Sequence, residues 1–506
     1  MKFYNKLTIG LAALAMTFAS CSDEYMNGEN ERTLEAETAA GIIADDPAFV
    51  DSYVNGLWSY MASYVVNHDI FGVTSIHHAT EMMGEDLVMY NSNWFIYDYQ
   101  HDYRLEHWTR TFYFWSTFYT MIDKANEIIG FYPDGPKDEI GRGAYGNALA
   151  VRAYSYLYLT QLYCNPTDTL GNVALDAPGV PIIATAAEGF ELDEIEALTG
   201  RNTVGKVFEV IEADITAAIE MLDGYTRPNK NYIDKSVAQG IAARYYQLAQ
   251  KWPEAQAAAK AARAGYPIMS GTAEVNGIRD GFMDVNNTEW MWGFDHTSET
   301  QTTYASFFSH MSNLAPGYSG LAYTGRGIDA RLYSQIPASD YRKIYWYNDA
   351  AGNTQATVAR TTAGSKLPLA ILKHGWDGTW TMDYLYMRGA EMLLIEAEAL
   401  ARQEGKGEEA AAVLKELMQE RDPEWNMPSV DVESIYFQRR LELIGEGFAY
   451  YDLKRLNKGI ERSYEGTNHM SGCQLDVPAG DVRWTFQIPQ RELQENTHIS
   501  DEEQND

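Results

Sequence analysis

The stretch "SVAQGIAARYYQLAQKWPEAQAAAKAARAGYP" at residues 236–267 decides the fold class. Alanine and other small or apolar residues recur at three- and four-residue spacing on both sides of Lys251-Trp252, as they do on one face of a helix. Pro253 follows that dipeptide directly, and proline is tolerated in the first turn of a helix. The stretch therefore predicts two short helices joined at Lys251-Trp252, and their many alanines let the two backbones approach closely.

A second hairpin of matching length is predicted at residues 386–419, with a break at Gly405-Lys406-Gly407. A generic pair of antiparallel helices is one interpretation of either stretch. Two alanine-rich hairpins of about 34 residues in one chain instead favour a scaffold of tetratricopeptide-like helical units.

Further helices precede the first hairpin. Residues 148–163 are apolar almost throughout and predict a buried helix that ends before the Asn-Pro pair at 165–166. Residues 203–223 show helical periodicity, with Thr203 placed to cap the start and Gly224 placed to end the helix. The fold class expected is mostly α.

Two segments interrupt the helical pattern, at about residues 70–104 and 268–385. Glycine, serine, threonine, asparagine and aromatic residues dominate both. Within the second, "TEWMWGFDH" (288–296) predicts a strand and "APGYSGLAYTGRGID" (315–329) predicts a loop. Binding residues are often carried by loops that a rigid frame positions, so these two segments are the candidates for a ligand-binding region.

The N-terminus has the features of an export signal. Lysines precede an apolar run at residues 7–19, which is too short to span a bilayer, and small residues precede Cys21. The pattern resembles a bacterial lipoprotein signal, although Phe18 stands where that signal usually has leucine. It predicts a signal peptide at residues 1–20, an acylated Cys21 and a flexible tether at 21–40, followed by one domain over 41–506. An ordinary secretory signal with an incidental cysteine is the alternative.

The acids Asp23 and Glu24 resemble an export signal toward the outer face of the outer membrane. We therefore expect a lipid-anchored protein on the extracellular side of that membrane. Lipid on Cys21 would anchor the chain without a transmembrane helix.

Composition excludes one class of partner. The chain has 39 Lys and Arg against 71 Asp and Glu, a net charge of −32. Nucleic-acid binding requires cationic neutralisation of phosphates, so it is not expected. Of three cysteines, Cys164 and Cys473 stand in neither a metal-binding nor a redox spacing, and we expect both to be buried thiols. A disulfide between them is the alternative, although their separation gives no evidence for it.

Motifs for catalysis are missing from the sequence. It has no phosphate-binding glycine loop, no dinucleotide fingerprint and no nucleophile elbow. His77, His78 and Glu81 lie close together in "IHHATE", but a third metal ligand is not evident, so we expect a structural role for them. The interpretation is a protein that is not an enzyme and needs no cofactor or metal.

The stretch "FQRRLELIGEGFAYYDLKRLNKG" (437–459) resembles the Arg-x-x-Glu-Leu…Glu-Gly…Asp-Leu-x-Arg signature of the RagB/SusD family. The arginine that usually follows Glu-Gly is replaced here by "FAYY". Other landmarks of the family follow in the expected order from about residue 40 to the end of the chain. The matching residues are Arg439, Arg440, Glu442, Leu443, Glu446, Gly447, Asp452, Leu453 and Arg455.

The resemblance implies a surface glycan-binding lipoprotein. Such a protein would capture oligosaccharide or polysaccharide and deliver it to a SusC-like TonB-dependent outer-membrane transporter, without chemistry. The charged signature residues are spaced for ion pairs that tie a helix to a turn, and we expect them to hold the frame instead of binding ligand.

The resemblance also implies that the sugar site draws on both irregular segments. Trp94 would offer a flat apolar face to sugar C–H groups, and Asp and Asn side chains would bridge vicinal hydroxyls. For any one aromatic residue, packing in the core is the alternative. The candidates are Asp86, Tyr90, Asn91, Asn93, Trp94, Tyr304, Phe308, Tyr318 and Tyr323, with Trp346, Trp376 and Trp380 as additional ones.

Other functions remain open at this point. The chain could bind a peptide or another nutrient, it could be a structural lid for a transporter, or it could be a glycoside hydrolase. A hydrolase would need two carboxyl groups ~5–10 Å apart across the scissile bond, and sequence alone does not place such a pair.

Overall fold

The computed structural model describes residues 36–63, 65–184, 192–270, 281–321, 324–346 and 362–506. The chain forms two compact units, Met1–Pro47 and Ala48–Asp506. The described part of the first contains helix α3 (Ala36–Asp45). The second contains the remaining elements, and Cys21 lies outside the described residues.

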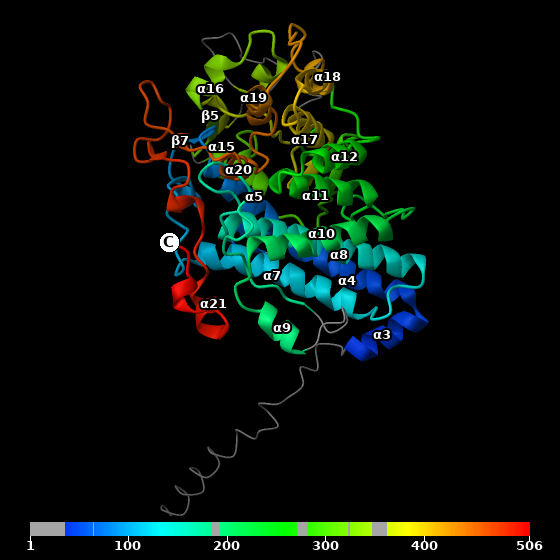
Figure 1. Cartoon of the computed structure of the whole chain (residues 1–506). Coiled ribbons are helices and arrows are strands. Elements are labelled where there is room, and N and C mark those ends of the chain that lie inside the picture. Colours follow the sequence, from blue (N-terminus) through cyan, green and yellow to red (C-terminus); the bar gives the residue numbers. More distant parts are fainter. Residues whose placement is uncertain (1–35, 64, 185–191, 271–280, 322–323, 347–361) are drawn as a thin grey trace, which may run out of the picture. The chain divides into compact units, whose positions relative to one another are not determined.

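A row of helices forms the frame of the second unit (Figure 1). Helix α7 packs on α8, α8 on α10, α10 on α11, α11 on α12, and α12 on α17, which also contacts α18 and α19. Both predicted hairpins are confirmed, as α11–α12 and α17–α18, and the mostly α fold is confirmed with them. The bounds are α7 Thr109–Gly130, α8 Glu139–Tyr163, α10 Val204–Met221, α11 Lys235–Leu248, α12 Trp252–Ala262, α17 Gly389–Ala401, α18 Gly407–Met418 and α19 Val432–Glu442.

Local sequence explains where these helices begin and end. The Thr203 side chain accepts a hydrogen bond from the Lys206 amide, 3.2 Å away, and so caps α10 as predicted. Asp234 caps α11 in the same way through the Val237 amide, at 2.9 Å. Gly224 has a φ of +77°, a left-handed conformation that glycine adopts without steric cost, beyond the end of α10.

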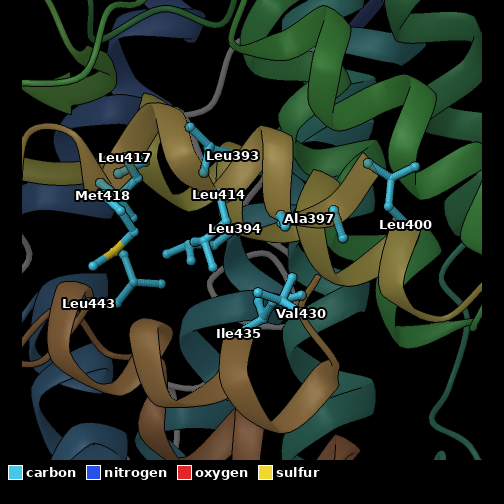
Figure 2. Packing of buried hydrophobic residues seen from close by; sticks show 13 residues of the cluster. Leu393, Leu394, Ala397, Leu400, Leu414, Leu417, Met418, Val430, Ile435 and Leu443 are labelled. Carbon is cyan, nitrogen blue, oxygen red and sulfur yellow. The ribbon is translucent and has the colours of Figure 1, made fainter. Parts of the chain in front are cut away.

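The best-defined apolar core lies between α17, α18 and α19 (Figure 2). Leu393, Leu394 and Ala397 project from α17 toward Leu414 on α18 and Ile435 on α19, and all five side chains are buried. Removing this much apolar surface from water is the main source of stability for such an interface.

Strands in the described chain are short and pair in four antiparallel ribbons. One of them, β3 (Leu87–Met89) with β5 (Arg326–Ile328), joins the two segments predicted to be irregular. The pairs are β1 (Val65–Asn67) with β2 (Ile70–Phe71), β3 with β5, β4 (Trp290–Phe294) with β6 (Tyr384–Arg388), and β7 (Ile460–Glu461) with β8 (Asp476–Val477).

The structure corrects part of the loop prediction. Residues 70–104 contain α5 (Val73–Met82), a helix whose ten side chains are all buried. The 315–329 stretch contains α15 (Tyr318–Leu321) and strand β5 instead of loop alone. The predicted strand within 288–296 is confirmed as β4.

The remaining elements connect the frame to these segments. In the described part of the chain, no helix combines the length and the apolar character needed to cross a bilayer. The bounds are η1 Pro47–Val50, α4 Asp51–Ser63, α6 Ile96–Tyr99, α9 Leu192–Leu198, α14 Phe307–Met311, α16 Ala330–Gln335, η3 Tyr341–Tyr345, η4 Gly364–Lys366, α20 Ala449–Arg455, η5 Val482–Trp484, α21 Gln490–Glu495 and η6 Asp501–Glu503.

Candidate ligand-binding site

Three rings from distant parts of the sequence meet around that of His68, which lies in the turn between β1 and β2. The His68 ring centroid is 5.3 Å from that of Trp94, 6.2 Å from that of Tyr304 and 5.7 Å from that of Tyr318. The rings of His68 and Tyr304 are parallel within 7°, and the rings of Tyr304 and Tyr318 are 5.5 Å apart. We call these four residues the aromatic cluster.

Hydrogen bonds hold His68 and Tyr318 of the aromatic cluster in place. His68 Nδ1 bonds to the Tyr318 hydroxyl, and the His310 Nε2–H donates to the His68 carbonyl oxygen at 2.7 Å. The His310 ring also stacks on Tyr318, at 4.8 Å and 18°. Burial lowers the pKa of His310 to about 3, so this ring is neutral at physiological pH. An uncharged ring thus supports both the backbone and a side chain of the cluster.

A buried arginine holds the turns that carry His68 and Trp94. The Arg110 guanidinium lies 2.8 Å from the Asp69 carboxylate and 2.9 Å from the Asp98 carboxylate, and it lies over the Phe95 ring at 5.0 Å. It also donates to the Asp69 carbonyl oxygen at 2.9 Å. Buried and bidentate contacts of this kind restrict side-chain freedom, so the cluster is preorganised.

An open pocket of about 530 Å³ lies beside the cluster. Tyr304 is 46% exposed and Trp94 is 43% exposed, which is unusual for such large apolar side chains. Of the described residues that line the pocket, none has a permanently charged side chain. They are Asn67, His68, Gln301, Thr302, Thr303, Tyr304, Ala305 and Trp380.

The structure brings three of the predicted residues together, namely Trp94, Tyr304 and Tyr318. Asn93 is next to them in a supporting place, because its Oδ1 accepts a hydrogen bond from the Phe95 amide, 3.1 Å away, within the turn that carries Trp94. Asn91 is exposed on the preceding turn.

Tyr90 donates its hydroxyl hydrogen bond to the Pro368 carbonyl. It lies against Gly327, where a Cβ atom would collide with the phenol ring. Tyr90 therefore packs on β5, and Tyr323 lies outside the described residues.

Two predicted site residues belong to the frame instead. The Asp86 carboxylate is buried and is engaged by the Arg440 guanidinium. Phe308 is 2% exposed and stacks on Tyr384, 6.4 Å away. The ion pair and the burial leave neither side chain open to a ligand in this structure.

Of the three additional tryptophan candidates, one lines the pocket and two pack within the protein. Trp346 is buried, Trp376 packs partly buried against Leu314 and Leu372, and Trp380 lines the pocket. His68 was not among the predicted residues. The signal that could have identified it is its place at the tip of a tight turn between two apolar runs, in "VVNHDIF".

The signature residues form buried ion pairs, as the sequence predicts. Glu442 lies 2.9 Å from Arg388, 2.9 Å from Arg421 and 3.5 Å from Arg342. These cations outweigh the effect of burial and hold the pKa of Glu442 well below its usual range. We call these four residues the ion-pair cluster.

Asp452 pairs in turn with Arg439 and with Arg455, at 3.0 and 2.8 Å. It therefore connects α19 to α20, and this network belongs to the frame. Both cysteines, Cys164 and Cys473, are free and buried, as predicted.

Polar groups of the "IHHATE" stretch are used in hydrogen bonds to other parts of the chain. His77 Nε2 bonds to the Tyr154 hydroxyl at 3.1 Å. Glu81 accepts hydrogen bonds from the amides of Gly445 and Gly447, at 2.7 and 3.0 Å. Within the described ranges, no group of three or more His, Cys, Asp or Glu residues is arranged to hold a metal ion.

Comparison with known proteins gives the family. The family SusD-like_3, described as "Starch-binding associating with outer membrane", matches residues 24–261. The family SusD_RagB, described as "SusD family", matches residues 317–506. No curated protein is similar enough to this chain to count as a match.

Solved structures share the fold. A SusD-like carbohydrate binding protein from Bacteroides vulgatus is 22% identical, with a TM-score of 0.73 over 90% of this chain and 98% of that one. The surface glycan-binding protein A from Bacteroides uniformis is 16% identical, with a TM-score of 0.65 over 91% and 99%. A laminarin binding SusD-like protein is 18% identical, with a TM-score of 0.61 over 90% and 98%. These likenesses show the shared fold, and the two family matches, at residues 24–261 and 317–506, place the chain in the RagB/SusD family.

Proposed function

We propose that this protein binds a glycan at the aromatic cluster and delivers it to a SusC-like TonB-dependent outer-membrane transporter. The observation that carries the proposal is the exposure of Trp94 and Tyr304, whose rings both lie against that of His68, beside an open pocket. Rings held this way offer flat apolar faces to the C–H groups of a pyranose, and stacking of this kind is the usual way proteins hold sugars.

The polar residues of the pocket suit a neutral glycan. Asn67, Gln301 and the threonine pair at 302–303 supply amide and hydroxyl groups that donate to and accept from sugar hydroxyls. A uronic acid or a sulfated sugar would find no permanent cation among the described lining residues, and the chain's net charge of −32 opposes a polyanion.

The names of related structures agree with this ligand class. They include a carbohydrate binding protein, a surface glycan-binding protein and a laminarin binding protein. These structures support a shared fold. Because they are at most 22% identical to this chain, they leave the particular sugar to experiment.

Binding without catalysis is part of the proposal. Glycoside hydrolysis needs two carboxyl groups within roughly 10 Å of each other across the scissile bond. Of the described residues that line the pocket, none is Asp or Glu. A binding role needs only stacking and hydrogen bonds, which the site offers.

The N-terminal sequence and the family support a location of this protein at the outer membrane. Acylation of Cys21 would anchor the protein at the outer membrane, with the ligand face toward the exterior. A glycan-binding protein in that place would hold ligand beside its transporter, which is the role proposed here.

Affinity electrophoresis of the purified protein against neutral and anionic polysaccharides tests the proposal. We expect retardation on a neutral glycan, its loss in Trp94→Ala, and its retention in Leu170→Ala, a matched change at an exposed apolar side chain outside the cluster. Retardation on no glycan, or retardation that Trp94→Ala leaves unchanged, would overturn the proposal. Release of new reducing ends by the wild-type protein would favour a hydrolase.

A further inference from the structure

We infer that a second aromatic platform, made of Tyr97, Tyr103 and Trp108, binds a further stretch of the same glycan chain. The inference rests on the proposed function, and it goes beyond that function by assigning a second subsite and a long polysaccharide as the ligand.

The three rings form one surface group. The Tyr97 ring centroid lies 4.7 Å from that of Tyr103 and 6.4 Å from that of Trp108, and Tyr103 and Trp108 are 5.0 Å apart. The rings of Tyr97 and Trp108 are parallel within 21°. Tyr97 is 44% exposed, about as much as Trp94 and Tyr304 in the aromatic cluster.

The polar ends of these rings are available to a ligand. Among the described residues, neither the Tyr97 hydroxyl, the Tyr103 hydroxyl nor the Trp108 indole N–H has a hydrogen-bond partner, and none of these atoms is buried. A tyrosine or tryptophan that serves only the core usually has its polar atom paired when buried. Here each ring presents an apolar face together with a free polar atom, which is the combination that sugars use.

One helical turn connects the platform to the aromatic cluster. The Ile96 amide donates to the Asn93 carbonyl at 3.0 Å, which closes the turn that leads into α6. Trp94 lies in this turn, and Tyr97 lies three residues later in the α6 helix that follows it. The platform therefore follows the aromatic cluster directly along the chain.

Arg110 fixes the two surfaces with respect to each other. Its guanidinium binds Asp69, the neighbour of His68, and Asp98, the neighbour of Tyr97. The same guanidinium lies 5.7 Å from the Tyr103 ring centroid. A single buried cation thus positions the aromatic cluster and the platform together, so one stiff ligand can contact both without an ordering cost to the protein.

The charge around the platform and its position after Trp94 in the chain both bear on which ligand fits. The Arg110 guanidinium, which lies over the Tyr103 ring, is already paired with the carboxylates of Asp69 and Asp98. A guanidinium paired in this way offers little attraction to a polyanion. A neutral polysaccharide that leaves the first site past Trp94 would meet Tyr97 next, whereas a short oligosaccharide would occupy the first site alone.

Calorimetric titration with a length series of the retained neutral glycan tests the inference. Tyr97→Ala should weaken binding of long chains by about threefold to tenfold, the worth of one stacked ring. The affinity for the shortest bound oligosaccharide should not change. Tyr97→Phe, which keeps the ring, should retain most of the long-chain affinity and shows that the turn itself tolerates substitution.

The outcomes separate this inference from the proposed function. If wild-type protein binds long and short chains and Tyr97→Ala leaves both affinities unchanged, the second subsite is wrong and the first stands. If Tyr97→Ala weakens both lengths equally, Tyr97 belongs to the first site and the second subsite is again wrong. If wild-type protein binds no glycan, the proposed function fails and the inference with it.

Discussion

The ion-pair cluster around Glu442 and the aromatic cluster around His68 both gather side chains from distant parts of the chain. In the first, every charge is buried and has partners on several sides. In the second, the rings of Trp94 and Tyr304 are half-exposed beside an open pocket. Glu442, at the centre of the first cluster, is one of the residues that reveal the family, whereas no signature residue lies in the second, so a family signature identifies a frame and leaves the ligand face to each protein.

Lowering the pH should have the largest effect, because it acts on buried groups that titrate and not on the exposed rings of Trp94 and Tyr304. Burial lowers the pKa values of seven described histidines, to about 3 for His77, His101, His310 and His374, to about 4 for His296, well below 6.5 for His78, and below 6.5 for His469. Between pH 6.5 and about 4 these histidines take up protons only in the unfolded state, which lowers the free energy of unfolding as pH falls.

Three buried carboxyls act in the opposite direction. Burial raises the pKa of Glu81 to about 7, and those of Asp98 and Asp383 to about 6, so their protonation favours the folded state over the same range. The histidines outnumber these three carboxyls, so the free energy of unfolding should have a positive slope against pH near pH 5. Urea unfolding at a series of pH values measures this slope, and a flat or inverted profile would contradict it.

A single histidine variant sharpens the test. Both ring nitrogens of His374 are buried without a hydrogen-bond partner among the described residues. His374→Phe should therefore keep the fold and reduce the slope by about 1.4 kcal/mol per pH unit.

The next largest effect should come from Glu442→Gln. The change leaves the guanidinium groups of Arg388 and Arg421 buried with weaker partners, and breaking such a pair costs about 3–5 kcal/mol of the free energy of unfolding. Glu433→Gln is the matched control, because the Glu433 side chain is 68% exposed in its pair with Lys458 and such pairs contribute about 0–1 kcal/mol. Chemical denaturation of the three proteins decides, and equal stabilities would show that the ion-pair cluster does not hold the frame.

Phe308, in α14, and Tyr304, in the segment just before that helix, offer a comparison between near neighbours in sequence. Phe308→Ala should lower the free energy of unfolding by about 3–5 kcal/mol, because a buried ring leaves a cavity. Tyr304→Ala should change it by about 0.5 kcal/mol or less and should instead remove glycan retardation. Melting curves and affinity electrophoresis on both variants make the comparison, and the reverse pattern would place Phe308 in the binding site.

The smallest effect expected is that of His68→Leu. Leucine fills similar space but loses the ring face between Trp94 and Tyr304 and the hydrogen bond to Tyr318. We expect glycan affinity to fall by about fivefold, which corresponds to about 1 kcal/mol, with little change in melting temperature. Titration calorimetry gives the number, and an unchanged affinity would show that His68 only supports the turn.

Sequence reasoning succeeded where local pattern determines local structure. The α11–α12 hairpin, the Thr203 cap and strand β4 all follow from periodicity and from residue types within a few positions. Helix α5 was missed because its whole circumference is buried, so its residues show no amphipathic period.

The site was harder to predict for a different reason. Trp94, Tyr304 and Tyr318 were identified from their loop context and aromatic character, yet Asp86 has the same context and is ion-paired to Arg440. The partner that withdraws Asp86 from the surface stands 354 positions later, and no local pattern reveals it. His68 went unnoticed because one polar residue in a turn has no distinguishing spacing.

The long separation in sequence between the members of the aromatic cluster has a consequence for folding. His68 and Tyr318 are 250 positions apart, so closing the loop between them has a high entropic cost and their contact should form late. Contacts that are absent from the folding transition state affect unfolding rates far more than folding rates. A bound glycan should therefore leave the refolding rate of this protein nearly unchanged and lengthen the lifetime of its native state.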